Sequence, residues 1–539
     1  CFGGSMNETY QGLSSDGNSE TIDVNISWDI GRDGVRTIEC KALFDSIWNK
    51  KVSKIKVCDI PDEIEKIFIE HANNASIPEL LNEISVPKKD PYWLGDKHLM
   101  KHQIRAYDEW LGNDRRGVYK HATGSGKTIS GLFAIKDSLE RNEVPILIVP
   151  SIDLQRQWYE QIAYYLKDVV CLKCGGDGNL YQWKKTLPSW TYAGNGKKLV
   201  LAVINTACSD DFINNLTQGK HLFVITDEVH RAGGKKFRNI TSIRSGARLG
   251  LSATPERYRD DEGTNAIFDY FGKIVDTFTL KDAIDLKILT EYFYYPCRVE
   301  LTNSETKSWK KITRRILYTM SKSDNTNPFD NDELMKLIIK RARIIKNAFN
   351  KIDAAVRIIT DNYKSPQKWI IYCDNKRQLD ALKNQLSSKF DVSVYYSGME
   401  GDREATLSYF ASHSGLLLSI KCLDEGIDVP ATSHALIIAS SQNPREFTQR
   451  RGRVLRKADG KNYSYVYDIL VSPPEGMAES DSYSIMRSEI VRAIKFGENA
   501  VNKSTCINDL RCYALDCNID PDTFTDEGFE LDLEDEDDE

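Results

Sequence analysis

Short apolar runs alternate with helical segments from about residue 96 to about residue 295. The clearest runs are residues 145–150 (PILIVP), 198–206 (KLVLAVINT), 221–226 (HLFVIT) and 248–252 (RLGLS). Strands that alternate with helices in this way are typical of a parallel sheet covered by helices. This stretch is therefore predicted to form an α/β lobe.

A second series of apolar runs follows nearer the C-terminus. It consists of residues 369–373 (WIIYC), 392–396 (VSVYY), 416–420 (LLLSI), 435–439 (ALIIA) and 463–470 (YSYVYDIL). The same alternation predicts a second, similar α/β lobe. Residues 296–350, between the two series, are polar and helical in character and include the basic stretch 336–346 (KLIIKRARIIK), which indicates a linker or a helical insertion.

The chain is too long for a single domain, because hydrophobic cores stop growing at about 250–300 residues and this chain has 539. The expected divisions are an accessory domain at residues 6–95, a first lobe at 96–295, the linker or insertion at 296–350, a second lobe at 351–475, a helical extension at 476–515 and an acidic tail at 516–539. Residues 1–5 precede Met6 and are expected to be a cloning remnant, with natural numbering starting near Met6.

The formal net charge of −7 is concentrated at the C-terminal end. Residues 516–539 contain thirteen carboxylates, and without them the chain up to Leu515 carries +6. A basic body fits a protein that binds phosphates, whereas the acidic tail is expected to be disordered. No apolar run approaches the roughly 18 residues that cross a bilayer and no secretory signal is visible, so we expect a cytoplasmic protein without a membrane partner.

Twelve cysteines are scattered along the chain without the dense pattern of a small secreted domain. Cys171 and Cys174 form the one suggestive pair, but a zinc site needs four ligands and no second pair lies nearby. Cys506, Cys512 and Cys517 could join them across the fold, although their irregular spacing argues against it. A zinc site is therefore not expected.

Residues 122–128 (ATGSGKT) follow a strand-like stretch and lead into a helical pattern, which is the context of a phosphate-binding P-loop. Glycines let the backbone N–H groups wrap the phosphates of ATP, Lys127 reaches the β and γ oxygens, and the Thr128 hydroxyl helps to hold Mg²⁺. The residues predicted to bind the nucleotide here are Thr123, Gly124, Ser125, Gly126, Lys127 and Thr128. His121 stands where the pattern normally opens with a glycine.

Residues 227–230 (DEVH) directly follow the apolar run 221–226. Their carboxylates are therefore predicted to project from the carboxyl edge of the sheet toward the nucleotide. Asp227 would then bind Mg²⁺, and Glu228 would orient or deprotonate the attacking water. Residues 252–255 (SATP) follow the next strand, and their hydroxyls could hydrogen-bond the acidic pair or the other lobe.

Residues 449–456 (QRRGRVLR) place several guanidinium groups on what is predicted to be one helix. Arg453 and Arg456 are three residues apart and would share a face of that helix. They can act as arginine fingers that stabilise charge developing on the γ-phosphate, with Gln449 as a further catalytic candidate. A basic helix facing nucleic acid is the alternative interpretation.

The sequences ATGSGKT, DEVH, SATP and QRRGRVLR, in this order, resemble motifs I, II, III and VI of superfamily 2 helicases of the DEAD/DEAH-like type, over about residues 96–475. Residues 251–257 (LSATPER) and 280–289 (LKDAIDLKIL) are similar to the type III restriction-subunit and transcription-repair translocase branch. The resemblance implies two tandem RecA-like lobes that close on ATP.

The resemblance also implies roles for residues outside these four motifs. Gln103 matches the glutamine that reads adenine, and residues 419–430 (SIKCLDEGIDVP) resemble motif V, in which Gly426 and Asp428 link the nucleotide to the nucleic acid. The residues that match first-lobe contacts to the sugar-phosphate backbone are Pro150, Ser151, Gln157 and Thr206. Such contacts carry little base specificity, so sequence-tolerant binding is expected.

The function expected is that of an ATP- and Mg²⁺-dependent helicase or translocase in restriction, phage defence or DNA repair. The resemblance, rather than the residues themselves, favours DNA over RNA and 3′→5′ movement. A first alternative is the motor of a nuclease, either through a partner protein or in cis through Glu39, Cys40 and Lys41, which resemble the end of a restriction-type metal site. A second alternative is a non-catalytic binding module, which intact Lys127 and Glu228 disfavour.

Overall fold

The computed structural model describes residues 2–4, 22–24, 32–52, 91–176, 182–194, 196–257, 260–322, 332–420, 432–438, 452–458, 460–474 and 479–521. The chain forms two compact units, Cys1–Asp90 and Pro91–Glu539. In the first unit, β1 (Phe2–Gly4) and β2 (Ile22–Val24) pair antiparallel and α2 spans Arg32–Trp48. The second unit contains both predicted lobes.

The first lobe is built on a seven-stranded sheet with the order β11-β5-β10-β9-β6-β8-β7, in which every pair is parallel. Its strands are β5 (Arg116–His121), β6 (Val144–Val149), β7 (Val170–Cys174), β8 (Lys198–Val203), β9 (Gly219–Asp227), β10 (Ser245–Ser252) and β11 (Ile274–Phe278). All six residues of β6 are buried, as expected for a parallel strand covered on both faces. The four predicted runs correspond to β6, β8, β9 and β10.

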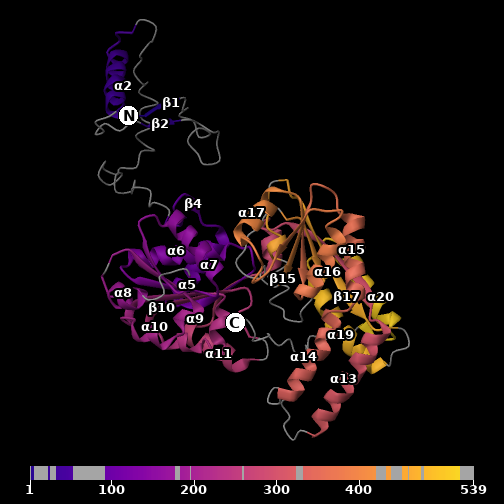
Figure 1. The fold of residues 1–539 in the computed structure, drawn as a ribbon. Coiled ribbons are helices and arrows are strands. Elements are labelled where there is room, and N and C mark those ends of the chain that lie inside the picture. Colours follow the sequence, from indigo (N-terminus) through magenta and orange to yellow (C-terminus); the bar gives the residue numbers. More distant parts are fainter. Residues whose placement is uncertain are drawn as a thin grey trace. The chain divides into compact units, whose positions relative to one another are not determined.

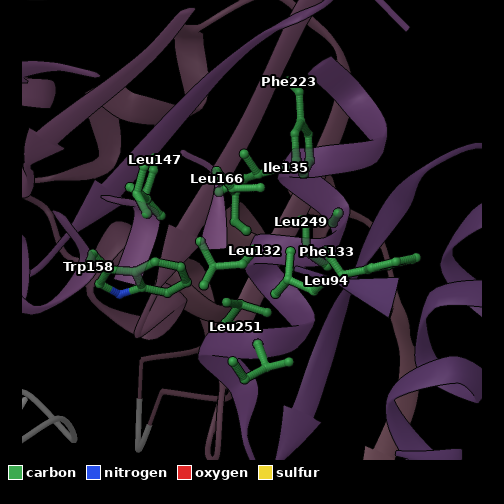
Figure 2. Close-up of a cluster of buried hydrophobic side chains, with 14 of the residues drawn as sticks. Leu94, Leu132, Phe133, Ile135, Leu147, Trp158, Leu166, Phe223, Leu249 and Leu251 are labelled. Atoms are coloured by element: carbon green, nitrogen blue, oxygen red, sulfur yellow. The ribbon is translucent and has the colours of Figure 1, made fainter. Parts of the chain in front are cut away.

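Helices connect these strands and cover the sheet (Figure 1). They are α5 (Lys101–Gly112), α6 (Lys127–Glu140), α7 (Ile152–Tyr165), α8 (Gln182–Trp190), α9 (Ile204–Ala207), α10 (Asp210–Asn214), α11 (Asp261–Phe271) and α12 (Leu280–Asp285), with the 3₁₀ turns η1 (Val229–Gly233) and η2 (Arg238–Ser242). A short hairpin of β3 (Trp93–Leu94) and β4 (Lys97–His98) precedes α5. Figure 2 shows Leu132 of α6 among Leu249 and Leu251 of β10 and Trp158 of α7, all of them buried.

The second lobe has a six-stranded sheet with the order β12-β17-β16-β13-β15-β14, again with every pair parallel. Its strands are β12 (Glu291–Glu300), β13 (Lys368–Cys373), β14 (Val392–Tyr395), β15 (Gly415–Ile420), β16 (His434–Ile437) and β17 (Tyr463–Ser472). Helices α15 (Asn350–Asn362), α16 (Lys376–Leu386) and α17 (Arg403–Ser412) join them. Two parallel α/β sheets confirm the predicted pair of lobes.

The expected boundary between the first lobe and the insertion, at residue 295, is wrong because it falls inside β12. All ten residues of β12 pair with β17, from Glu291 with Tyr463 to Glu300 with Ser472. The second lobe therefore begins before residue 296. Pro296 obscured this strand, but a proline is tolerated in β12 because this strand is at the edge of its sheet.

The helical insertion is a hairpin of α13 (Asn303–Lys322) and α14 (Asp332–Lys346), which run side by side (Figure 1). Ile316 from α13 packs with Leu334, Leu337 and Ile338 from α14 in a small core of its own. Eleven lysines and arginines lie in the two helices, against three carboxylates. The hairpin is therefore a basic element attached to the second lobe.

The C-terminal extension consists of α19 (Glu479–Gly497) and α20 (Lys503–Asp516), which pack on the second sheet. Arg492 of α19 is fully buried and pairs with Asp468 of β17 at 3.2 Å and with Glu489 at 3.1 Å. Asp516, the first residue of the expected acidic tail, ends α20 and pairs with Arg298 at 2.9 Å. The rest of that tail, from residue 522, lies outside the described residues. Among the described helices, none has the length and apolar character needed to cross a bilayer.

Candidate functional site

The predicted P-loop connects the end of β5 to the first residue of α6. Gly124 and Gly126 have φ angles of +86° and +88°, the left-handed region that favours glycine. Lys127 begins α6 and donates from Nζ to the His121 carbonyl at 3.2 Å. The loop therefore presents the positive end of a helix and a lysine at the carboxyl edge of the sheet, which is an anion-binding arrangement.

His121 anchors the P-loop to the neighbouring strand β11. Its imidazole is fully buried, with Nε2 2.8 Å from Oδ2 of Asp276 in β11. Arg105 of α5 reaches the same carboxylate at 2.6 Å. Burial lowers the pKa of His121, while the Asp276 carboxylate opposes that shift. The residue that departs from the usual glycine thus ties the loop to α5 and β11, which a glycine could not do.

Gln103 lies beneath the loop, and only 1% of it is exposed. Its Oε1 accepts from the Met100 N–H at 2.9 Å and its Nε2 donates to the Gly126 carbonyl at 3.2 Å. One N–H and one lone pair of the amide remain beyond these two bonds, and adenine recognition by Gln103 stays a prediction.

Two hydroxyls of the loop fit a phosphate ligand. The Oγ1 atom of Thr123 and the Oγ atom of Ser125 are buried and make no hydrogen bond within the described part of the chain. A buried polar group without a partner costs about 1–3 kcal/mol, and phosphate oxygens could accept from both hydroxyls. Thr128 is half-buried in the first turn of α6, where the predicted Mg²⁺ ligand would stand.

The acidic pair ends β9, as predicted. Asp227 is 7% exposed, and its carboxylate accepts from the Trp158 indole N–H at 2.8 Å and from the Glu228 backbone N–H at 3.0 Å. Burial raises the pKa of Asp227, whereas the Trp158 hydrogen bond and the Lys127 charge lower it. Asp227 therefore faces the lysine of the P-loop in a setting suited to a cation ligand.

Glu228 is held by the serine of SATP. Its φ of +47° is left-handed, a strained conformation for a residue with a side chain that is typical of functional positions. The Ser252 hydroxyl lies 3.5 Å from Glu228 Oε2 and 3.1 Å from Nδ1 of His230. The expected link between SATP and the acidic pair is present in the structure.

Arg453 and Arg456 are not on one helix, so that prediction is wrong. The described helical turn covers Gly452–Val454, and Arg456 forms an antiparallel bridge with Leu289, in the segment that joins the two sheets. The shared-face argument for the two arginines therefore fails. Gln449, Gly426 and Asp428 lie outside the described residues.

The arginine segment, residues 452–456, lies against the P-loop. A Cβ atom built on Gly452 would come within 2.5 Å of the Thr123 Cβ atom. A Cβ atom built on Gly124 would lie 3.4 Å from the Gly452 carbonyl oxygen and 3.7 Å from Cγ of Arg456. The P-loop and the arginine segment can approach this closely because Gly124 and Gly452 have no side chain.

The residues predicted to contact nucleic acid gather at the carboxyl ends of β6 and β8, which are neighbours in the sheet. Pro150 follows β6, Ser151 caps α7 by accepting from the Leu154 N–H at 3.3 Å, and Gln157 is half-buried in α7. Thr206 lies in α9, directly after β8. They form one edge beside the P-loop and the acidic pair.

Sequence reasoning missed two glycines at the same edge. Gly175 and Gly176 follow β7 with φ angles of +79° and +66°. A Cβ atom on Gly175 would lie 2.1 Å from Oγ1 of Thr206, and one on Gly176 would lie 2.4 Å from Oε1 of Gln155. A glycine pair directly after a strand signals a turn with close backbone contact and could have drawn attention to this position.

Cys171 and Cys174 lie on β7, three residues apart, so their side chains point to opposite faces of the sheet. Burial raises the pKa of Cys171 to about 12. The described residues contain no group of three or more histidine, cysteine and acidic side chains that could hold a metal ion. The pair does not have the geometry of a zinc site.

Comparisons with known proteins agree with this arrangement. Residues 96–257 match the family "Type III restriction enzyme, res subunit", and residues 350–458 match "Helicase conserved C-terminal domain". The chain is 27% identical to the DNA 3'-5' translocase XPB2 of Sulfurisphaera tokodaii, over 67% of this chain and 79% of that protein. It is 24% identical to the DNA 3'-5' helicase XPB of Mycobacterium tuberculosis, over 79% of this chain and 72% of that protein.

A solved structure shares the fold. It is titled ATP-dependent Type ISP restriction-modification enzyme LlaBIII bound to DNA, and matches with a TM-score of 0.53 and 16% identity over 78% of this chain. The chain spans 33% of the length of that enzyme. The two family matches lie on the two sheets, and the lobes carry the helicase motifs at the expected strand ends. The two matched stretches together carry the two halves of a superfamily 2 helicase, an ATP-dependent enzyme of the kind represented by the DNA helicase and translocase named above.

Proposed function

We propose that this chain is an ATP-driven motor that moves 3′→5′ along DNA, with hydrolysis at the meeting point of its two lobes. The observation that carries the proposal is the approach of the arginine segment to the P-loop, measured by the 2.5 Å between a Cβ atom built on Gly452 and the Thr123 Cβ atom. The arginine segment follows β16 and precedes β17 of the second sheet, whereas the P-loop follows β5 of the first. Residues from both lobes can therefore act on one phosphate group.

The roles of individual residues follow from their places around the loop. Lys127 and the N–H groups at the start of α6 bind phosphate oxygens, and the Thr123 and Ser125 hydroxyls gain acceptors. Thr128 and Asp227 would hold Mg²⁺, which neutralises phosphate charge when bound. Glu228, held near Ser252 and His230, orients the attacking water. Arg453 and Arg456 stabilise charge on the γ-phosphate.

Three observations support DNA as the nucleic acid along which the motor moves. The hairpin of α13 and α14 carries eleven basic residues against three acidic ones, and a surplus of positive charge favours phosphate binding. The related proteins named above are a DNA translocase and a DNA helicase, and the structural neighbour was solved with DNA. The polarity is carried over from the same relatives.

Two measurements test the proposal. ATP hydrolysis is measured with single-stranded DNA, duplex DNA and RNA of equal length, and stimulation by DNA is expected to exceed stimulation by RNA. Displacement of streptavidin from oligonucleotides with biotin at one end then gives the polarity, since a 3′→5′ motor clears the 5′ end. Equal stimulation by RNA would overturn the choice of DNA, and faster clearance of the 3′ end would overturn the polarity.

A second candidate function is the motor of a nuclease assembly, which the match to a restriction-enzyme subunit favours. A nuclease in cis through Glu39 and Lys41 has little geometric support. Both residues lie in the middle of α2, and residues two apart on a helix do not face each other. Incubating supercoiled plasmid with the purified chain, ATP and Mg²⁺ or Mn²⁺ tests the cis activity. Plasmid cutting that is lost in the Lys41→Ala variant would support a nuclease in cis.

A further inference from the structure

The backbone of the arginine segment is held by side chains that lie outside every motif assigned above. The Val454 carbonyl accepts hydrogen bonds from the Lys461 ammonium and, at 2.9 Å, from the Ser464 hydroxyl. The Leu455 carbonyl accepts from the Thr290 backbone N–H at 2.8 Å and from the Thr290 hydroxyl at 3.0 Å. The Arg456 carbonyl accepts from Lys461 at 2.7 Å. Three consecutive carbonyls are thus bound by three side chains.

These three residues, Thr290, Lys461 and Ser464, form what we call the carbonyl clamp. Thr290 and Ser464 are 4% and 0% exposed, and their hydroxyls lie 2.8 Å apart. Each hydroxyl has one proton, so either can donate to the other or to its carbonyl, and the Thr290 backbone N–H binds the Leu455 carbonyl in both cases. Lys461 is brought back toward the segment by a turn in which its N–H donates to the Ala458 carbonyl and Gly460 has a φ of +76°. Burial lowers the pKa of Lys461 to about 7, because desolvation disfavours its charged form.

The clamp connects the arginine segment to the chain that joins the two sheets. Thr290 is the residue directly before β12, and its neighbour Leu289 forms the bridge with Arg456. Leu289 also faces the P-loop, since a Cβ atom built on Gly124 would lie 2.9 Å from its Cδ2 atom. The joining segment therefore contacts the phosphate loop on one side and fixes the arginine segment on the other.

We propose that Thr290, Lys461 and Ser464 are positioning residues for ATP hydrolysis, which hold the backbone of residues 454–456 so that Arg453 and Arg456 meet the nucleotide in the correct place. The inference rests on the proposed role of these arginines. A clamp is useful because the segment leaves its helical turn after Val454 and, within the part of the chain that the structure describes, enters no named strand, with Arg456 forming an isolated bridge to Leu289. The clamp side chains therefore supply hydrogen bonds to these carbonyls that a continuing helix or strand would supply from its backbone.

The test compares clamp variants with a matched control in the full-length chain. The clamp variants are Lys461→Met and the double change Thr290→Val with Ser464→Ala, and Lys461→Arg is the conservative rescue. Ser472→Ala is the control, because Ser472 lies on β17 like Ser464, is buried, and donates to the Val299 carbonyl at 3.3 Å away from the arginine segment. DNA-stimulated turnover, the affinity for a fluorescent ATP analogue and the melting temperature are measured for each.

We expect the clamp variants to lose roughly ten- to a hundredfold in kcat, because small displacements of a catalytic group have effects of this size. Nucleotide affinity should stay within about twofold, as for any loss confined to the transition state. Lys461→Arg should recover most of the turnover, and Ser472→Ala should match the wild type. Adding Arg453→Ala to a clamp variant should cost no more than Arg453→Ala alone, since both act through the same group.

Two outcomes separate the failure of this inference from the failure of the function on which it rests. If Arg453→Ala abolishes turnover but the folded clamp variants keep the wild-type kcat, the clamp does not position the arginines. If Arg453→Ala itself hydrolyses ATP normally, the assignment of the arginines is at fault. Should Lys461→Met fail to fold, the Thr290→Val change alone carries the same test, since the backbone N–H of residue 290 still binds Leu455.

Discussion

The indole N–H of Trp158, in α7, donates a hydrogen bond of 2.8 Å to Oδ2 of Asp227, at the end of β9. This bond lowers the pKa of a carboxyl group that burial raises. Asp227 has to be ionised to bind a cation, so the bond keeps it in its active form toward lower pH. The same tryptophan lies in the hydrophobic core (Figure 2), which couples the packing of the first lobe to the carboxylate proposed to bind Mg²⁺.

Replacing Trp158 by phenylalanine removes the donor and keeps an aromatic ring. The pKa of Asp227 should rise, so the acidic limb of the pH–rate profile should move to higher pH. More Mg²⁺ should also be needed to reach the half-maximal rate. A pH–rate profile at several Mg²⁺ concentrations measures both effects. Trp183→Phe, a buried tryptophan elsewhere in the lobe, is the control, and identical acidic limbs for the two variants would contradict the role of the bond.

Lys127→Ala and Glu228→Gln should affect different steps. Losing the ammonium removes charge from the phosphate site, so Lys127→Ala is expected to abolish hydrolysis and weaken ATP binding. Glu228→Gln should retain ATP binding and block turnover, because only the orientation of the water is lost. Equilibrium nucleotide binding beside phosphate release distinguishes them. Normal hydrolysis by Glu228→Gln in the presence of DNA would show that the acidic pair has been assigned wrongly.

Gly452→Ala tests the approach of the arginine segment to the P-loop without touching an arginine. The new Cβ atom would lie 2.5 Å from the Thr123 Cβ atom, and overpacking typically costs about 1–3 kcal/mol. If that cost falls on the closed state, turnover should drop roughly five- to a hundredfold. Gly112→Ala, where an added Cβ atom meets nothing within 4 Å, should leave turnover unchanged. Equal rates for the two variants would place the segment elsewhere during hydrolysis.

Arg492→Met should destabilise the second lobe strongly. The substitution removes the guanidinium that forms ion pairs with the buried carboxylates of Asp468 and Glu489, and breaking a buried ion pair costs about 3–5 kcal/mol. The melting temperature should fall by several degrees, and it should recover in part at lower pH, where the carboxylates can take up protons. Arg511→Met, an exposed position on α20, should change the melting temperature little. A stable Arg492→Met protein would mean that the network contributes nothing.

The acidic C-terminal segment is predicted to compete with DNA for the basic surface. Ending the chain after Pro521 removes eleven carboxylates and keeps the pair between Asp516 and Arg298. Affinity for DNA should increase at low salt, and the difference should shrink as salt rises, because charges are screened over about 8 Å at physiological salt. Unchanged affinity at low salt would exclude competition.

Most strands of the two sheets could be predicted from the sequence, because strands buried on both faces are continuous apolar runs, as in β6 and β9. The sequence did not reveal β12, whose aromatic and polar residues surround Pro296, or β7 and β11, which are the two edge strands of the first sheet. The P-loop and the acidic pair are local in sequence and were found. The place of Arg456 depends on pairing with Leu289, 167 residues earlier, so local periodicity could not indicate it.

The buried contact between Arg492 and Asp468 also limits how the motor can be dissected. A fragment that ends at residue 475, the expected end of the second lobe, would retain Asp468 on β17 but lose α19 and with it Arg492, which forms an ion pair with that buried carboxylate. It would also uncover Tyr294 and the neighbouring core that Phe496 covers. The smallest second lobe that can be exchanged between related motors, or expressed by itself, therefore extends through α20 to Asp516.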